Sequence, residues 1–318
     1  MKLGLRRSAL SFSSWFCLPE QGMKDFEILN RASAFLVRAT GPGSRARNKV
    51  GGREFVERAP FPAPKVHLVT SSHVVAPWRW PKYYADEWLQ QVNERHTMYT
   101  AEMRHADGVF ATQSELKPIS YHHATRDLAA LHFENEDEVL ALLDEVGVDV
   151  LQLSPAEAAP LVAGDALEFH GHEVQGTGSE EVDARVSLPR ISGGAVQGRT
   201  PHQIFAKTAP VLCQGMCGGP VLHRRPEGGG PHCVGLVEGI VPSNHASPEL
   251  QSLAVFVESR EIRSFLADVE DGLVAPLIGG HSVAAVNADQ DEDKMNLDKI
   301  LAGGGDAPPV QSNFPSSK

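Results

Sequence analysis

The chain has 318 residues, of which 42% are hydrophobic and 22% are charged, and its formal net charge is −11. This composition is that of a globular protein with one large or two small domains. The acidic balance argues against a nucleic-acid partner, and no apolar run reaches the roughly 20 residues that a membrane-spanning helix needs.

Residues 1–30 are predicted to form a leader. The first 19 residues contain Lys2, Arg6, Arg7 and several serines, and no acidic residue precedes Glu20. This composition is typical of an organellar transit peptide and favours import into the mitochondrion or another organelle. A secretory signal, whose apolar region the serines would interrupt, and an unstructured N-terminus are the alternatives.

The four cysteines are too few for a disulfide framework in a chain of this length. They are Cys17, Cys213, Cys217 and Cys233. Because one of them lies in the predicted leader, we expect a reducing, intracellular compartment. The sequence leaves a Cys213–Cys233 disulfide open.

Short strands punctuated by turns dominate residues 31–145. Alternating apolar and polar residues dominate, residues 126–133 form a short apolar run, and Asp107-Gly108 predicts a hairpin turn between two of the strands. The predicted strands span residues 33–41, 64–75, 96–104, 108–116 and 126–133.

A polar, partly helical connection follows at residues 134–164, and a second group of strands begins after it. Apolar spacing over residues 259–270 predicts one closing amphipathic helix, and residues 271–318 are predicted to be a disordered tail. The strands of this second half are predicted at 165–174, 184–196, 202–212, 218–224, 232–241 and 253–259.

So many short strands predict an all-β fold in two halves, which we expect to be two six-stranded antiparallel β-barrels followed by a helix. The expected N-terminal barrel spans residues 31–145, and the expected C-terminal barrel spans residues 146–270. The connection at residues 134–164 would then join the two.

Three chemically reactive side chains occur in a suggestive order along these halves. His73 stands in "VTSSHVV", Asp127 follows 54 residues later in "RDLAAL", and Cys217 follows another 90 residues later in "GMCGGP". Taken alone, each is more often structural: a hydrogen-bonded core histidine, a turn carboxylate and an inert thiol. Their order and spacing favour a shared site.

The set resembles the chymotrypsin-like double-barrel peptidases, with cysteine at the usual serine position, as in viral 3C-like cysteine peptidases. The resemblance covers roughly residues 31–270, and its strongest single element is Gly-Met-Cys-Gly-Gly-Pro. It implies two barrels of the chymotrypsin type and a cysteine endopeptidase that acts on a protein or peptide and needs no cofactor or metal.

The roles implied by the resemblance agree with the chemistry of the residues. An imidazolium beside a thiol favours the thiolate, so His73 would activate Cys217 and later protonate the leaving amine. Asp127 would fix the tautomer of His73. The backbone N–H groups of Gly215 and Cys217 would form the oxyanion hole.

Departures from the family refine this expectation. Met216 stands where secreted members carry an aspartate that pairs with a new N-terminus, so no proteolytic activation is expected. The resemblance puts the substrate pocket at Val211, Val237, Glu238, Gly239 and Ile240, which hints at a small or apolar substrate side chain. Glu238 would orient a substrate or bond with the Asp127 region, or else simply face solvent.

Three alternatives compete with these assignments. Cys213, Cys217, His232 and Cys233 could bind zinc, but their spacing is not that of a usual zinc knuckle, and we expect no metal. The aromatic segment 76–91 fits core or lid packing, or a partner platform. The rival to the peptidase itself is an inactive pseudo-peptidase that serves as a binding or scaffold subunit. The sequence does not indicate an oligomeric state.

Overall fold

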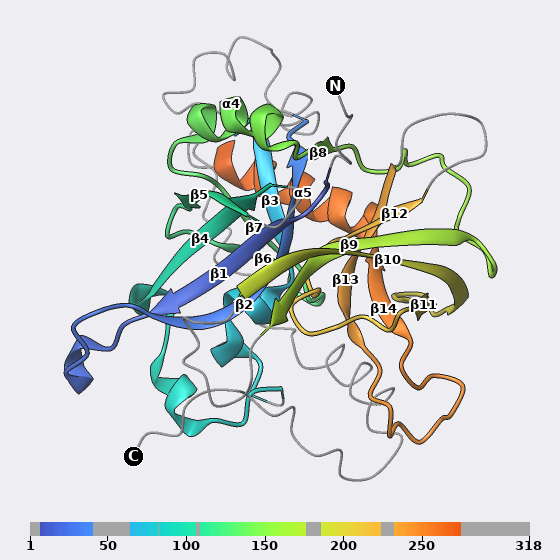
Figure 1. Ribbon diagram of the computed structural model, residues 1–318, viewed down its shortest axis with the longest axis horizontal. Coiled ribbons are helices and arrows are strands. Elements are labelled where there is room, and N and C mark those ends of the chain that lie inside the picture. Colours follow the sequence, from blue (N-terminus) through green and yellow to red (C-terminus); the bar gives the residue numbers. More distant parts are fainter. Residues whose placement is uncertain are drawn as a thin grey trace.

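A computed structural model of the protein describes residues 7–40, 64–81, 83–105, 109–175, 186–223 and 232–274. These residues form a largely β structure in two parts, an open sheet and a closed barrel, with a helix at the C-terminal end (Figure 1). The sheet strands lie at the left in Figure 1 and the barrel strands at the right.

The N-terminal part is an eight-stranded sheet in the order β5-β4-β1-β2-β3-β7-β6, and β8 pairs in parallel with β2. Its core is apolar, and Phe12, Leu68 and Tyr99 are fully buried in it. Its strands are β1 (Leu10–Phe16), β2 (Glu27–Arg38), β3 (Val66–Thr70), β4 (Thr97–Arg104), β5 (Phe110–Glu115), β6 (Tyr121–His122), β7 (Ala129–Leu131) and β8 (Val150–Leu151).

The N-terminal sheet does not close into the predicted six-stranded barrel. Strands β6 and β7 have only two and three residues. Across the described residues, the side of the sheet that carries β5 meets the end of β7 through one isolated bridge, Leu116–Phe133. One bridge in place of a continuous ladder leaves the sheet open.

The predicted leader is part of this sheet. Strand β1 pairs with β2 on one side and with β4 on the other, and Leu10 and Phe12 are almost completely buried. The N-terminal part therefore starts before the predicted boundary at residue 31, because β1 pairs within the sheet. Import into an organelle stays a prediction. Residues 1–6 lie outside the described part of the chain.

The C-terminal part is a closed six-stranded antiparallel barrel in the order β10-β11-β14-β13-β12-β9, as predicted. Phe169 and Phe256 meet edge to face in its interior with their ring centroids 6.1 Å apart, in a geometry typical of stable aromatic pairs. Its strands are β9 (Ala166–Gln175), β10 (Val186–Arg199), β11 (Ile204–Ala209), β12 (Pro220–His223), β13 (His232–Ile240) and β14 (Ala254–Glu258).

Two longer helices flank these parts. Helix α4 (Glu136–Val146) lies in the predicted connection and ends at Gly147, whose φ of +70° is the left-handed conformation usual at a helix end. Helix α5 (Ser259–Val274) is the predicted closing helix. The shorter helices are η1 (Pro19–Gln21), α3 (Ser72–Val75), η2 (Pro77–Arg79), η3 (Glu87–Gln91) and η4 (Glu94–His96).

Helix α5 packs where the sheet and the barrel meet. Its Ile262 and Phe265 share one apolar cluster with Phe35 of β2 and with Leu222 and Leu236 of the barrel. This cluster fixes the two parts against each other. The helix also takes up residues 271–274 of the predicted tail; the rest of that prediction, residues 275–318, lies outside the described part of the chain.

All four cysteines are free, so the structure contains no Cys213–Cys233 disulfide. Among the described residues, no cluster of three or more His, Cys, Asp and Glu side chains is placed to hold a metal ion. Within the same residues, no helix is both long and apolar enough to span a membrane.

Candidate functional site

His73 lies in the short helix α3, which begins directly after β3. Its ring Nδ1 is 2.5 Å from Asp127 Oδ2, and its backbone N–H donates to Asp127 Oδ1 at 2.8 Å. Asp127 is 3% exposed and lies two residues before the start of β7, the strand that pairs with β3. The antiparallel β3–β7 pairing therefore brings together two residues that are 54 positions apart.

The turn that carries Cys217 depends on two glycines with positive φ. Gly215 has φ +94° and Gly218 has φ +81°, a conformation that side chains other than hydrogen rarely tolerate. A Cβ on Gly218 would lie 2.2 Å from both Ser33 O and Thr70 Oγ1. The glycines at these positions let the turn press against the N-terminal sheet.

Ser33 of β2 bonds to this turn through both its backbone and its side chain. Its backbone N–H donates to Cys217 O at 3.0 Å, and its hydroxyl donates to Gly215 O at 2.6 Å. The same hydroxyl accepts the backbone N–H of His172 at 2.8 Å. One serine of the sheet thus positions the cysteine of the barrel.

The Cys217 thiol and the His73 ring line the same cavity. Burial alone would lower the pKa of His73, but the charge of Asp127, the neighbouring Tyr84 and the hydrogen bonds with Asp127 and Cys217 raise it well above 6.5. The site thus favours a protonated imidazole beside the sulfur.

Aromatic rings surround His73. The Tyr83 ring lies nearly parallel to the imidazole with a centroid distance of 6.3 Å, and Trp80 meets it edge-on at the same distance. Tyr84 also packs there and accepts a hydrogen bond from Asn30 at 2.9 Å. The aromatic segment predicted as core, lid or platform thus forms one wall of the site.

His73, Asp127 and Cys217 open onto one cavity of about 250 Å³. Of the predicted pocket residues, Glu238, Gly239 and Ile240 line it, whereas Val237 is 1% exposed within the barrel core and Val211 is 49% exposed elsewhere. The residues that line the cavity beyond those predicted are Tyr83, Tyr84, Val241 and Val255.

Glu238 does not simply face solvent. Its Oε2 accepts a hydrogen bond from Gln203 Nε2 at 2.7 Å. Burial, followed by the negative charge of Asp127, raises its pKa to about 7. Near neutral pH this carboxyl group therefore exchanges a proton beside the His73–Asp127 pair.

The backbone N–H groups of Gly215 and Cys217 were predicted to bind an oxyanion. Neighbouring amides of the turn are engaged, since Met216 donates to Cys213 O and Gly218 donates to Val237 O. In the described part of the chain, no backbone carbonyl accepts from Gly215 or Cys217 N–H. These two donors remain available to a ligand.

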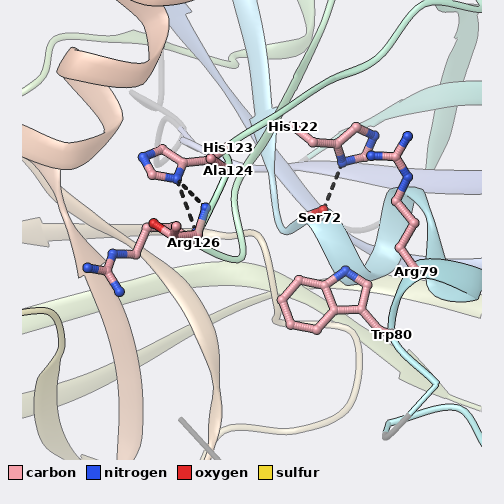
Figure 2. A pocket seen from close by; sticks show the side chains of 8 residues that line it. Ser72, Arg79, Trp80, His122, His123, Ala124 and Arg126 are labelled. Atoms are coloured by element: carbon pink, nitrogen blue, oxygen red, sulfur yellow. Dashed lines mark hydrogen bonds between the residues drawn. The ribbon is translucent and has the colours of Figure 1, made fainter. Parts of the chain in front are cut away.

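A small recess lies behind the site, between α3–η2 and the segment that connects β6 to β7 (Figure 2). In it, Ser72 Oγ is 2.8 Å from His122 Nδ1, and Ser120 Oγ is 3.0 Å from His122 Nε2. Burial lowers the pKa of His122 to about 3, so the ring is neutral. The recess has only about 20 Å³, and the Ser72–His122 hydrogen bond links α3, which carries His73, to β6.

Neither the protein-family models nor the curated proteins that were compared with the chain include a match. The function is therefore argued from the site itself.

Proposed function

We propose that the protein is a cysteine endopeptidase in which Cys217, His73 and Asp127 act as nucleophile, general acid–base and orienting carboxylate. One observation carries the proposal: three reactive groups, far apart in sequence and on two separate parts of the fold, converge on one cavity. A chymotrypsin-like arrangement, in which sheet and barrel each contribute to the site, is compatible with the closed barrel and the C-terminal helix.

The proposed reaction uses these groups in turn. The Cys217 thiolate attacks the carbonyl carbon of the peptide bond. The N–H groups of Gly215 and Cys217 stabilise the negative charge that develops on the carbonyl oxygen. The His73 imidazolium then gives its proton to the departing amine, which leaves a thioester. Water, deprotonated by His73, hydrolyses the thioester and regenerates the thiol.

Asp127 supports both proton transfers. Its hydrogen bond to Nδ1 leaves Nε2 as the ring nitrogen that faces the reacting atoms, and its charge stabilises the imidazolium. The Ile240, Val241 and Val255 side chains beside the site favour a peptide with an apolar side chain near the bond to be cleaved.

The test is the pH dependence of thiol alkylation by iodoacetamide. Cys213 is the other partly exposed thiol, so the measurement uses the Cys213→Ser background; Cys17 and Cys233 are buried. We expect Cys217 to react at acidic pH much faster than free cysteine, and His73→Ala to abolish this advantage. A Cys217 thiol that reacts no faster than free cysteine, with or without His73, would leave the scaffold function as the better account.

A further inference from the structure

A second cavity, of about 120 Å³, lies between the segment that leads into β1 and the β9–β10 hairpin. Arg7, Ser8, His170, His172 and Arg190 line it. Successive residues of a strand point to opposite faces, so His170 and His172 share one face of β9 and Gly171 has the other. Gly171 approaches the turn that carries Cys217, since its Cβ position lies 3.3 Å from Met216 Cα. Gly171 also lines this cavity, but no residue lines both this cavity and the one at Cys217, so the two are separate.

The cavity contains cations together with unsatisfied imidazole nitrogens. Arg7 is 7% exposed, and Arg190 pairs with Glu173 at 2.5 Å. His170 and His172 are 6% and 1% exposed, and the buried Nδ1 of each has no hydrogen-bond partner among the described residues. Buried polar atoms in native proteins nearly always have partners, so each of these nitrogens can bond with a group that enters the cavity.

Both imidazoles are neutral. Burial lowers the pKa of His170, and burial together with the charges of Arg7 and Arg104 lowers that of His172 to about 3. His170 Nε2 is 3.3 Å from the carboxylate of Glu168, which can only accept, so Nε2 carries the hydrogen. The Nδ1 atom of His170 is consequently an acceptor. The ligand must accept from guanidinium groups and also donate to an imidazole nitrogen.

We propose that this cavity binds inorganic phosphate, with Arg7 and Arg190 as donors to its oxygens and the neutral rings of His170 and His172 as partners of its hydroxyl groups. At neutral pH inorganic phosphate keeps at least one P–OH group, whereas sulfate and carboxylates carry none. Guanidinium groups bind such oxyanions through paired, charge-assisted hydrogen bonds. The groups surround the cavity from three segments of chain, which suits a tetrahedral anion better than a planar one.

Calorimetry on the whole protein at neutral pH tests the site, with inorganic phosphate and sulfate titrated at equal ionic strength. We expect saturable phosphate binding and weaker sulfate binding. Arg190→Gln should weaken phosphate binding about tenfold, the usual effect of losing one charge-assisted bond. His170→Phe, which keeps a ring but removes the acceptor, should abolish the preference for phosphate over sulfate.

Arg199→Gln is the matched control. Arg199 lies on the same strand, is 33% exposed compared with 34% for Arg190, and pairs with a carboxylate, Glu258, at 3.0 Å. It does not line the cavity, so phosphate affinity should be unchanged. Absence of saturable phosphate binding, sulfate binding as strong as phosphate binding, or equal weakening by Arg199→Gln would each overturn the proposal.

Discussion

Replacement of Asp127 by asparagine should destabilise the protein in a way that depends on pH. Asparagine has the shape of aspartate and can still accept the His73 backbone N–H with its amide oxygen, but it cannot supply the charge that Nδ1 faces at 2.5 Å. The variant therefore loses one charge-assisted hydrogen bond from a site where Asp127 is 3% exposed. Such bonds contribute about 1.5–3 kcal/mol.

The protonation of His73 determines whether the stability lost on Asp127→Asn increases or decreases with pH. Its folded-state pKa lies well above 6.5, so the folded protein holds the ring proton more tightly than the unfolded chain does. The stabilisation by Asp127 is thus complete below pH 6.5 and is lost as the pH rises through the folded-state pKa of His73. We expect Asp127→Asn to cost about 2 kcal/mol at about pH 5.5 and less than about 1 kcal/mol in strongly alkaline solution.

Urea unfolding of both proteins over this pH range measures the difference directly. Asp165→Asn serves as the control, because the Asp165 carboxylate accepts the Val162 N–H at 2.8 Å and, among the described residues, no histidine bonds to it. Its effect should not change with pH in the same range. If Asp127→Asn costs as much in alkaline as in acidic solution, Asp127 does not stabilise an imidazolium, and the reasoning fails.

Three further predictions concern the same parts of the molecule. Because the folded-state pKa of Glu238, about 7, exceeds its unfolded value of 4.5, stability should fall as the pH rises from 4.5 to 7, and Glu238→Gln should reduce this fall by about 2 kcal/mol in urea unfolding. Gly218→Ala should cost at least about 2 kcal/mol through its φ of +81° and its contact with Ser33 O, whereas Gly193→Ala, with nothing within 4 Å, should cost less than about 1 kcal/mol by the same assay. Deletion of residues 1–17 removes β1, whose buried apolar side chains stabilise the folded protein by about 1.5–3 kcal/mol each. We expect the truncated protein to show no cooperative unfolding by circular dichroism. A stable truncated protein would refute the assignment of β1 to the core.

The closed barrel and its following helix were predictable in part because some of the strands, such as β9, carry a local alternation of apolar and polar residues. The same signal was present in β1, where Leu10 and Phe12 alternate with Ser11 and Ser13. Composition obscured it, since arginine and serine are abundant both in transit peptides and in this strand. Counting residue types discards the order that defines a strand.

The candidate site was predictable only in part. Residues tied to a strand, such as Asp127 before β7 and Glu238 on β13, could be placed by pairing and alternation. Tyr83 and Tyr84 lie between the short 3₁₀-helices η2 and η3, which are too short for their three-residue period to be detected in a sequence. Of the residues predicted for the pocket, neither Val211, in the loop after β11, nor Val237, in the barrel core, lines the cavity.

Because Ser33 of the sheet bonds to the cysteine turn of the barrel, the candidate site needs both parts of the chain. His73 and Asp127 belong to the sheet and Cys217 to the barrel, and the cysteine turn hydrogen-bonds to Ser33 of the sheet. Two fragments separated in the connection before β9 would each retain part of the site without its complement. Reassembly of the fragments would bring the Cys217 thiol and the His73 imidazole together again. The reactivity of Cys217 would therefore report that the two fragments have associated.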